Sequence, residues 1–247
     1  MTAPILTIDC GNTRLKWGLH DGANWLAQGA LDYAALPRLA EALAAWPRPA
    51  RAVACNVAGA QAGEAVRATL NALGIALEWA RSRAAQGGVR NLYTEPARLG
   101  DDRWAALIGA RALHGRACLV VCAGTATTID ALDTEGNFQG GLILPGVALM
   151  QSALAANTAQ LPLAEGRFTH LPRNTADAIV SGCLHAQAGA VERMFAHMFT
   201  HAAAAPDALC LVSGGAADEF FDLLNVPKRR VDNLALEGLA RIGHAPD

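Results

Sequence analysis

One pattern of strands and glycine turns occurs twice in this chain, and it limits the folds that the chain can adopt. The first copy predicts three strands, at residues 4–9, 14–20 and 24–30. The second copy, "ACLVVCAGTATTIDAL" (117–132), predicts a strand, a glycine turn and a strand, and after "DTEGN" comes a third strand at 138–144. Because the pattern begins each half, it indicates an internal duplication, and we expect two α/β domains, residues 1–115 and 116–247.

Apolar periodicity predicts further elements in both halves. In the first half it predicts helices and one strand around an irregular segment (82–97), namely helices at 34–45, 61–73 and 101–113 and the strand at 51–57. In the second half it predicts four helices and a strand, namely helices at 147–156, 175–200, 216–224 and 233–242 and the strand at 208–215. Ligands of open α/β sheets bind at the carboxyl ends of strands, so we expect both glycine turns to face one cleft.

Composition excludes several classes of function. The 247 residues are 52% hydrophobic and 17% charged, which is typical of a globular protein rather than a disordered one. A formal net charge of −2 gives no electrostatic reason to expect nucleic acid or a membrane as a partner. No basic leader precedes the first strand, and no apolar run reaches the ~18–20 residues of a membrane helix. We therefore expect a cytoplasmic protein whose six cysteines, none in a C-x-x-C pair, are free thiols.

Both glycine turns have the composition of a phosphate-binding turn. Such a turn needs converging backbone N–H groups with no Cβ in the way, together with hydroxyl or amide side chains, and 11–13 ("GNT") and 124–128 ("GTATT") supply these. Asp9 can hold Mg²⁺, and Lys16 can approach phosphate oxygens as a point charge. One such turn alone is more often an ordinary strand connection, but two at matching positions favour phosphate binding. The sequence has neither G-x-x-x-x-G-K-[ST] nor G-x-G-x-x-G.

A third polar motif, "LGDDRWAALIGAR", opens the helix predicted at 101–113. Two acids at a helix start are explained by capping and by the helix dipole, while an Arg beside them also suits an anionic small molecule. On this helix Trp104, Leu107 and Ile108 share an apolar face, and Arg103 lies off that face.

Five segments together resemble the type III pantothenate kinases, of the actin, sugar kinase and heat-shock chaperone ATPase superfamily. They are "DCGNTRLKW", "LGDDRWAALIGA", "CAGTATTID", "GGLILPG" and "RNTADAIVSG". The resemblance implies two similar ribonuclease H-like domains with a cleft between them. It also implies ATP-dependent phosphorylation of pantothenate to 4′-phosphopantothenate, the first step of coenzyme A biosynthesis, by a homodimer.

The resemblance implies a role for particular residues. ATP and its phosphates would be bound by Asp9, Cys10, Gly11, Asn12, Thr13, Arg14, Leu15, Lys16, Gly124 and Thr125. Pantothenate would be bound by Tyr93, Gly100, Asp101, Asp102, Arg103 and Thr175. Asp9 would hold Mg²⁺, and Arg103 would pair with the carboxylate of pantothenate. Asp102 would be the catalytic base. With an ordinary pKa of ~3.9 it would orient the hydroxyl and accept its proton late in the transfer.

The chain departs from the family pattern at Cys122. The family commonly has Asp here, which helps to bind K⁺ or NH₄⁺, and a neutral thiol is a poor ligand for a hard cation.

Two other functions are compatible with the same fold. A regulatory protein, such as an accessory factor for transcription, would need a basic or exposed apolar surface. A sugar kinase or polyphosphate hydrolase would keep both phosphate turns but has no reason to carry G-D-D-R.

Overall fold

The computed structural model describes residues 3–157, 165–201 and 207–244. The chain divides into two compact units. Unit 1 contains the chain up to Gly115, residues 136–138 and the C-terminal helix; unit 2 contains residues 116–135 and 139–232. Within the described residues, no helix has both the length and the apolarity needed to span a membrane.

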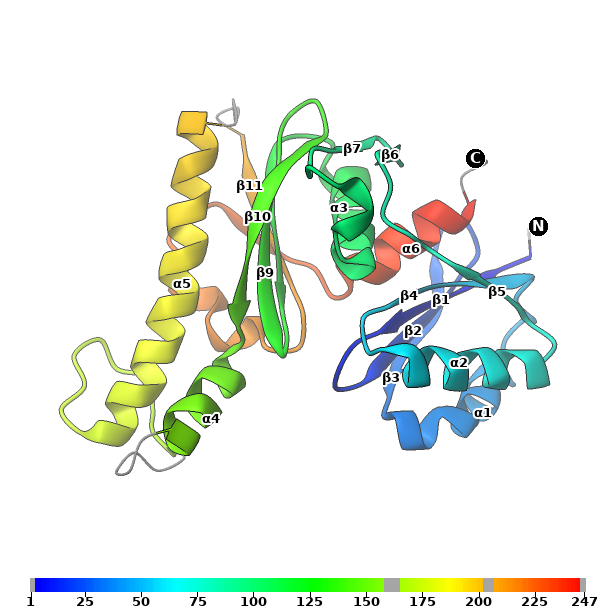
Figure 1. The fold of residues 1–247 in the computed structure, drawn as a ribbon, viewed down its shortest axis with the longest axis horizontal. Coiled ribbons are helices and arrows are strands. Elements are labelled where there is room, and N and C mark those ends of the chain that lie inside the picture. The colour runs from blue at the N-terminus through cyan, green and yellow to red at the C-terminus, as the bar shows by residue number, and fades with distance from the viewer. Residues whose placement is uncertain (1–2, 158–164, 202–206, 245–247) are drawn as a thin grey trace. The chain divides into compact units, whose positions relative to one another are not determined.

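Unit 1 is built on a five-stranded sheet in the order β3-β2-β1-β4-β5 (Figure 1). Its strands are β1 (Ile5–Cys10), β2 (Leu15–His20), β3 (Trp25–Leu31), β4 (Arg51–Asn56) and β5 (Ala76–Trp79). The central strand β1 is antiparallel to β2 and parallel to β4. The antiparallel strands β2 and β3 therefore lie on one side of β1, and the parallel strands β4 and β5 lie on the other.

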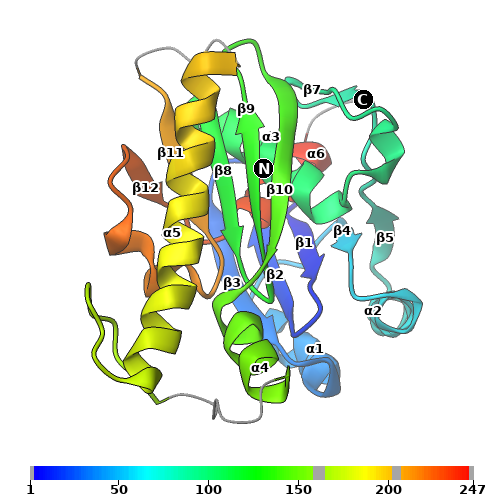
Figure 2. The ribbon, with the colours of Figure 1, turned by 60° about the vertical axis from the view of Figure 1, so that its left-hand side comes forward.

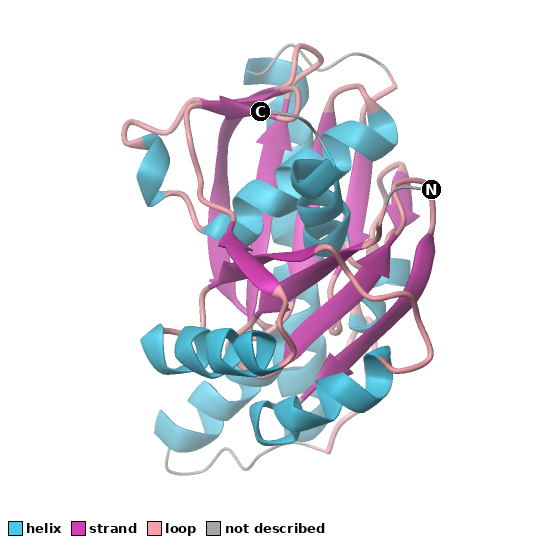
Figure 3. Cartoon of the chain, turned by 90° about the vertical axis from the view of Figure 1, so that its right-hand side faces the viewer, coloured by secondary structure: helices cyan, strands magenta, loops and turns pink. Residues whose placement is uncertain are grey.

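Helices cover both faces of this sheet (Figure 3). The 3₁₀ helix η1 (Tyr33–Arg38), α1 (Leu39–Leu43) and α2 (Ala60–Ala72) enclose one apolar core with β1, β2 and β4. The helices α3 (Asp101–His114) and α6 (Leu234–His244) pack against each other, and α6 contacts β1 and β4. The short elements β6 (Ala85–Gln86), β7 (Val89–Asn91) and η2 (Pro96–Arg98) lie in the segment predicted to be irregular.

Unit 2 repeats the strand order of unit 1. Its sheet runs β12-β11-β8-β9-β10, with β8 (Cys118–Ala123) antiparallel to β9 (Ala126–Leu132) and parallel to β11 (Leu209–Ser213). The outer strands are β10 (Asn137–Pro145), whose first residues belong to unit 1, and β12 (Lys228–Arg230). Both units thus place the first strand of the repeated pattern at the sheet centre, as expected of a duplication.

Helix α5 (Thr175–His201) lies along the sheet of unit 2, as Figure 2 shows. Its apolar residues, Val191 and Phe195 among them, form a core with β8, β9 and β11. Helix α4 (Val147–Asn157) follows β10, and the 3₁₀ turns η3 (Ala217–Glu219) and η4 (Phe221–Leu223) follow β11.

Three predicted features differ from the structure. The helix predicted at 34–45 is a 3₁₀ segment followed by a short helix, because Pro37 lacks the N–H that an α-helix needs there. The helix predicted at 216–224 is two 3₁₀ turns separated at Phe220, whose φ of −131° and ψ of 1° are not helical. Helix α6, expected in a domain spanning 116–247, packs in unit 1, where Arg51 donates to the Gly243 carbonyl at 2.7 Å.

Candidate active site

The turn between β1 and β2 has an exposed centre and buried ends. Cys10 and Leu15 pair across the hairpin and are fully buried in the core, whereas Asn12, Thr13 and Arg14 are exposed. The Tyr33 hydroxyl donates to the Gly11 carbonyl at 2.8 Å and ties the turn to the helical face of unit 1. Of the residues expected to contact ATP, Cys10 and Leu15 therefore have only their backbone atoms to offer.

Asp9 stands at the end of β1, directly before this turn. It pairs with Lys16 on β2 and, on the other side, with Cys55 on β4, whose Sγ–H donates to Asp9 Oδ1 at 3.4 Å. Burial raises the pKa of Asp9, the Lys16 ammonium lowers it, and the Asp102 carboxylate raises it. Because the charge of Asp102 affects Asp9, two of the predicted site residues lie in one electrostatic neighbourhood.

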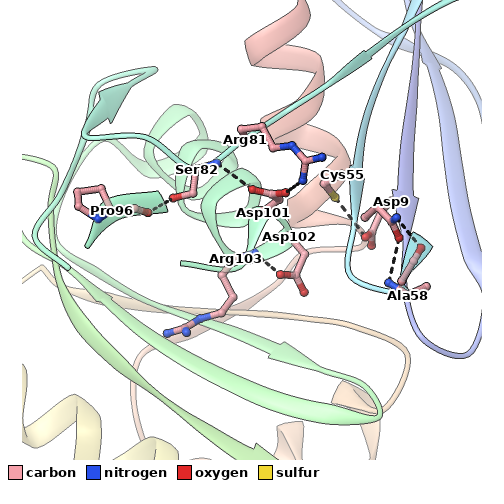
Figure 4. Close-up of polar contacts among 11 residues, drawn as sticks. Asp9, Cys55, Ala58, Arg81, Ser82, Pro96, Asp101, Asp102 and Arg103 are labelled. Carbon is pink, nitrogen blue, oxygen red and sulfur yellow. Dashed lines mark hydrogen bonds and ion pairs between the residues drawn. The ribbon is translucent and has the colours of Figure 1, made fainter. Parts of the chain in front are cut away.

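Asp102 lies in the first turn of α3, the position that its motif predicts. Its Oδ1 accepts the Arg103 N–H at 2.8 Å (Figure 4). Burial raises the pKa of Asp102, while the Arg103 N–H and guanidinium lower it. A Cβ at position 100 would lie 2.7 Å from Asp102 Oδ1, so the glycine in G-D-D-R makes room for this carboxylate.

The neighbouring acid, Asp101, anchors a loop instead. Its Oδ2 accepts from Arg81 at 2.7 Å and its Oδ1 accepts from the Ser82 N–H at 2.9 Å (Figure 4). The Ser82 hydroxyl in turn donates to the Pro96 carbonyl at 2.9 Å. Both oxygens of Asp101 thus have protein partners in the loop. The two adjacent carboxylates of the motif therefore have different contacts: Asp101 binds Arg81 and Ser82, and Asp102 binds the Arg103 N–H.

Arg103 is buried, although the helical pattern placed it off the apolar face. Its exposure is 6%, and its guanidinium donates to the Tyr93 hydroxyl at 3.0 Å. The guanidinium carbon lies 5.7 Å from the centre of the Tyr93 ring and 5.8 Å from that of Phe138. A cation can be buried here because these two rings and the hydroxyl replace part of its hydration. The structure therefore brings Tyr93 and Arg103 together, as the resemblance implied.

The second glycine turn is held by backbone contacts within unit 2. Gly124 N–H donates to the Ala126 carbonyl at 3.0 Å, and Gly146 N–H, before α4, donates to the Thr125 carbonyl at 2.9 Å. A Cβ at position 146 would overlap the Gly124 carbonyl and lie 2.8 Å from that of Thr125, so only glycine allows this approach. Gly124 and Thr125 are exposed at the turn.

Thr175, also in unit 2, is the first residue of α5 and is exposed. The preceding Asn174 and the later Asp177 form a reciprocal cap: Asp177 N–H donates to Asn174 Oδ1 at 2.9 Å, and Asn174 Nδ2 donates to Asp177 Oδ2 at 2.7 Å. The local structure at Thr175 is therefore a well-defined helix start.

The two expected metal sites fit the structure differently. No cluster of three or more His, Cys, Asp or Glu side chains able to hold a metal occurs among the described residues. Mg²⁺ is often bound through one or two carboxylates together with substrate phosphates, and the carboxylate of Asp9, next to the first glycine turn, has the donor chemistry for this. Cys122, half-buried at the end of β8, offers a thiol rather than oxygen and does not fit K⁺ or NH₄⁺.

Comparison with known proteins identifies the family. A model of the type III pantothenate kinase family matches residues 5–197. The chain belongs to this family. It is 58% identical to a type III pantothenate kinase of Aromatoleum aromaticum, with 96% of each chain covered, and 54% identical to one of Azoarcus sp., covering 98% of this chain and 91% of the relative.

A solved structure also has the fold of this chain. It is a protein from Campylobacter jejuni assigned to the Baf family of transcriptional activators, with a TM-score of 0.60, 18% identity and 96% of each chain covered. The expected α/β fold class, with two halves of similar strand order, is confirmed.

Sequence reasoning did not single out Cys55, Arg81 or Phe138, which contact the predicted site residues. Each lies outside the motifs, on β4, in the loop after β5 and on β10. The available signal was that Cys55, like Asp9, lies near the end of a buried strand, and the pairing of β1 with β4 had to be known before that signal could be used.

Proposed function

We propose that this protein transfers the γ-phosphoryl group of ATP to the terminal hydroxyl of pantothenate, giving 4′-phosphopantothenate. The observation that carries the proposal is the arrangement at the start of α3, where Asp102 lies beside a buried Arg103 held by Tyr93 and is close enough to Asp9 to raise the pKa of that carboxyl. Membership of the type III pantothenate kinase family supports both substrates.

In this proposal Asp102 acts on the hydroxyl that receives the phosphoryl group. Phosphoryl transfer has a loose transition state, so positioning and charge neutralisation contribute most of the catalysis. The Asp102 carboxylate orients the hydroxyl and accepts its proton late, and its raised pKa makes it a better proton acceptor than an exposed aspartate.

Asp9 and Lys16 serve the phosphates. They form a pair of opposite charges across the β1–β2 hairpin, beside the exposed turn at 11–14. Asp9 holds Mg²⁺, which neutralises phosphate charge when it is bound with ATP, and Lys16 contributes a positive charge to the same phosphates. In unit 2, Gly124 and Thr125 offer backbone and hydroxyl groups to the nucleotide.

Arg103 recognises the pantothenate carboxylate. A guanidinium that lies against two neighbouring rings and donates to the Tyr93 hydroxyl is pre-oriented, and its planar fork matches the geometry of a carboxylate. Gly100 keeps room for Asp102 beside the bound substrate, Asp101 holds the adjoining loop, and Thr175 contributes a hydroxyl from the start of α5.

The proposed location in the cell and the proposed dimer rest on the resemblance to the family and on exposed apolar side chains. We infer a cytoplasmic homodimer; all six cysteines are free thiols, and large apolar side chains of unit 2 are exposed, namely Leu142, Ile143, Leu149 and Leu154. The departure at Cys122 favours activity without a K⁺ or NH₄⁺ requirement. The alternative, a regulatory protein, has no support from the near-neutral charge, and the resemblance to the C. jejuni protein concerns the fold alone.

The test is ADP release by purified protein with ATP, Mg²⁺ and pantothenate, with and without K⁺ or NH₄⁺. We expect pantothenate-dependent turnover that falls by about 10²–10⁴-fold in Asp102→Asn, the usual worth of a general base. Asp222→Asn, the same change at an exposed position of unit 2, is the matched control and should retain wild-type turnover. No pantothenate-dependent ADP release from folded wild-type protein would contradict the proposal.

A further inference from the structure

Cys55 is a buried thiol in contact with the carboxylate of Asp9, near the end of β1. The parallel pairing of β1 and β4 places Cys55 directly opposite Asp9, and the Cys55 side chain is fully buried. Its Sγ lies 3.4 Å from Asp9 Oδ1, within hydrogen-bonding range for sulfur (Figure 4). The contact is between adjacent strands of one sheet, so its geometry is fixed by the backbone.

The environment of Cys55 makes it a hydrogen-bond donor rather than a reactive group. Burial raises the pKa of the Cys55 thiol well above its usual value, and the carboxylates of Asp9 and Asp102 raise it further. Even an ordinary thiol, with a pKa of ~8.5, carries its proton at neutral pH and can donate it. Among the buried residues of β4, namely Ala52, Val53, Ala54 and Cys55, only the last has a side chain that can donate a hydrogen bond.

We propose that Cys55 is a positioning residue for Asp9, its thiol proton fixing the orientation in which the carboxylate holds the Mg²⁺ of bound nucleotide. The proposal deepens the function proposed above and rests on the role given there to Asp9. A carboxylate has about four acceptor positions, so a donor on Oδ1 restricts its rotation while leaving capacity for a metal. Hydrogen-bond partners of metal ligands typically change metal affinity or activity by about 10–100-fold when they are removed.

The experiment compares Cys55→Ala, which removes the donor, with Cys55→Ser, which keeps one. Cys210→Ala is the matched control, because Cys210 is a fully buried strand cysteine in unit 2, and it reports the general effect of deleting a buried sulfur. Mg²⁺ is titrated calorimetrically into each protein with the non-hydrolysable analogue adenylyl imidodiphosphate. The Mg²⁺ dependence of kcat and the KM for pantothenate are measured in parallel.

We expect Cys55→Ala to weaken Mg²⁺ binding about tenfold, the low end of the range because a thiol is a weak donor. Its kcat at low Mg²⁺ should fall while the KM for pantothenate is unchanged. Cys55→Ser should stay within about threefold of wild type, because an O–H···O bond of 2.5–3.0 Å can replace the thiol contact. If Cys55→Ala does not fold, Cys55→Val fills the space without a donor and takes its place.

Equal Mg²⁺ affinity in Cys55→Ala and Cys210→Ala would overturn the proposal and leave the proposed function standing. Loss of Mg²⁺ affinity in Cys55→Ser as large as that in Cys55→Ala would also overturn it, because the donor would then not matter. If the wild type released no ADP with pantothenate, the proposed function would fail, and the calorimetric titration would still decide the role of Cys55.

Discussion

The two glycine hairpins have the same backbone plan but are built differently around the turn. In unit 1 the residue two positions before the glycine is Asp9, opposite Lys16; in unit 2 it is Cys122, opposite Thr128. The first turn is tied down by the Tyr33 side chain, and the second by the Gly146 backbone. The comparison shows that the duplication preserved a turn geometry while charge was retained in only one copy, which is where metal and phosphate chemistry is expected.

The largest effect should follow from removing the charge that distinguishes the first hairpin. Asp9→Asn should lower kcat/KM about 10²–10³-fold, because the carboxylate proposed to hold Mg²⁺ becomes a neutral amide of the same shape. Cys122→Ala, at the matching position of the second hairpin, should lower it less than about threefold, since a neutral group replaces a neutral group. Steady-state ADP release at saturating Mg²⁺ measures both.

Equal losses in the two variants would contradict this comparison and would show that the side chain at position 122 matters to catalysis as much as the Asp9 carboxylate does. A requirement for K⁺ or NH₄⁺ in the wild type that disappears in Cys122→Ala would indicate the same. In either case the assignment of cation chemistry to unit 1 alone would be wrong.

The next largest effect is on the free energy of unfolding, and it compares the backbone contacts of the two glycine turns. Gly146→Ala should destabilise the protein by about 1–3 kcal/mol, because the added Cβ overlaps the Gly124 carbonyl and neither backbone can move freely. In Gly11→Ala the nearest atom to the added Cβ is the Arg14 carbonyl at 3.2 Å, so the cost should be below about 1 kcal/mol. Urea unfolding of both variants gives the two free energies, and a larger cost at Gly11 would reverse the interpretation.

The sequence was sufficient for those features that depend on local pattern. Strand alternation around Gly11 and Gly124 predicted both hairpins, and an acid pair before Arg103 predicted a helix start with a carboxylate beside it. Pro37 is a local signal too, and it explains why one predicted helix begins as a 3₁₀ segment.

Features that depend on tertiary contacts could not be predicted from the sequence. Helix α6 has a strongly apolar side, but nothing in residues 234–244 says which sheet will receive that side. The helical pattern placed Arg103 off the apolar face and could not show its burial, because the rings of Tyr93 and Phe138 come from other elements. Cys55 becomes informative only after the parallel pairing of β1 and β4 is known.

The smallest expected effect is on thermal stability. It tests the difference in charge between Asp9 in the first hairpin and Cys122 in the second without measuring catalysis. Burial raises the pKa of Asp9 above 3.8, so between 3.8 and the folded-state value the folded chain binds more protons than the unfolded chain. The free energy of unfolding contributed by this group therefore falls as pH rises through that window, and its full cost is present at neutral pH. In buffer without Mg²⁺ or nucleotide, the Tm of Asp9→Asn should be higher than that of the wild type at pH 7, and the difference should shrink toward pH 4.

Cys122→Ser is the control. It removes no carboxylate, so its Tm difference from wild type should be the same at both pH values. A lower Tm for Asp9→Asn at pH 7 would mean that Lys16 and Cys55 more than offset the burial of this charge, and the first hairpin would then be stabilised by the carboxylate that it presents to its ligand.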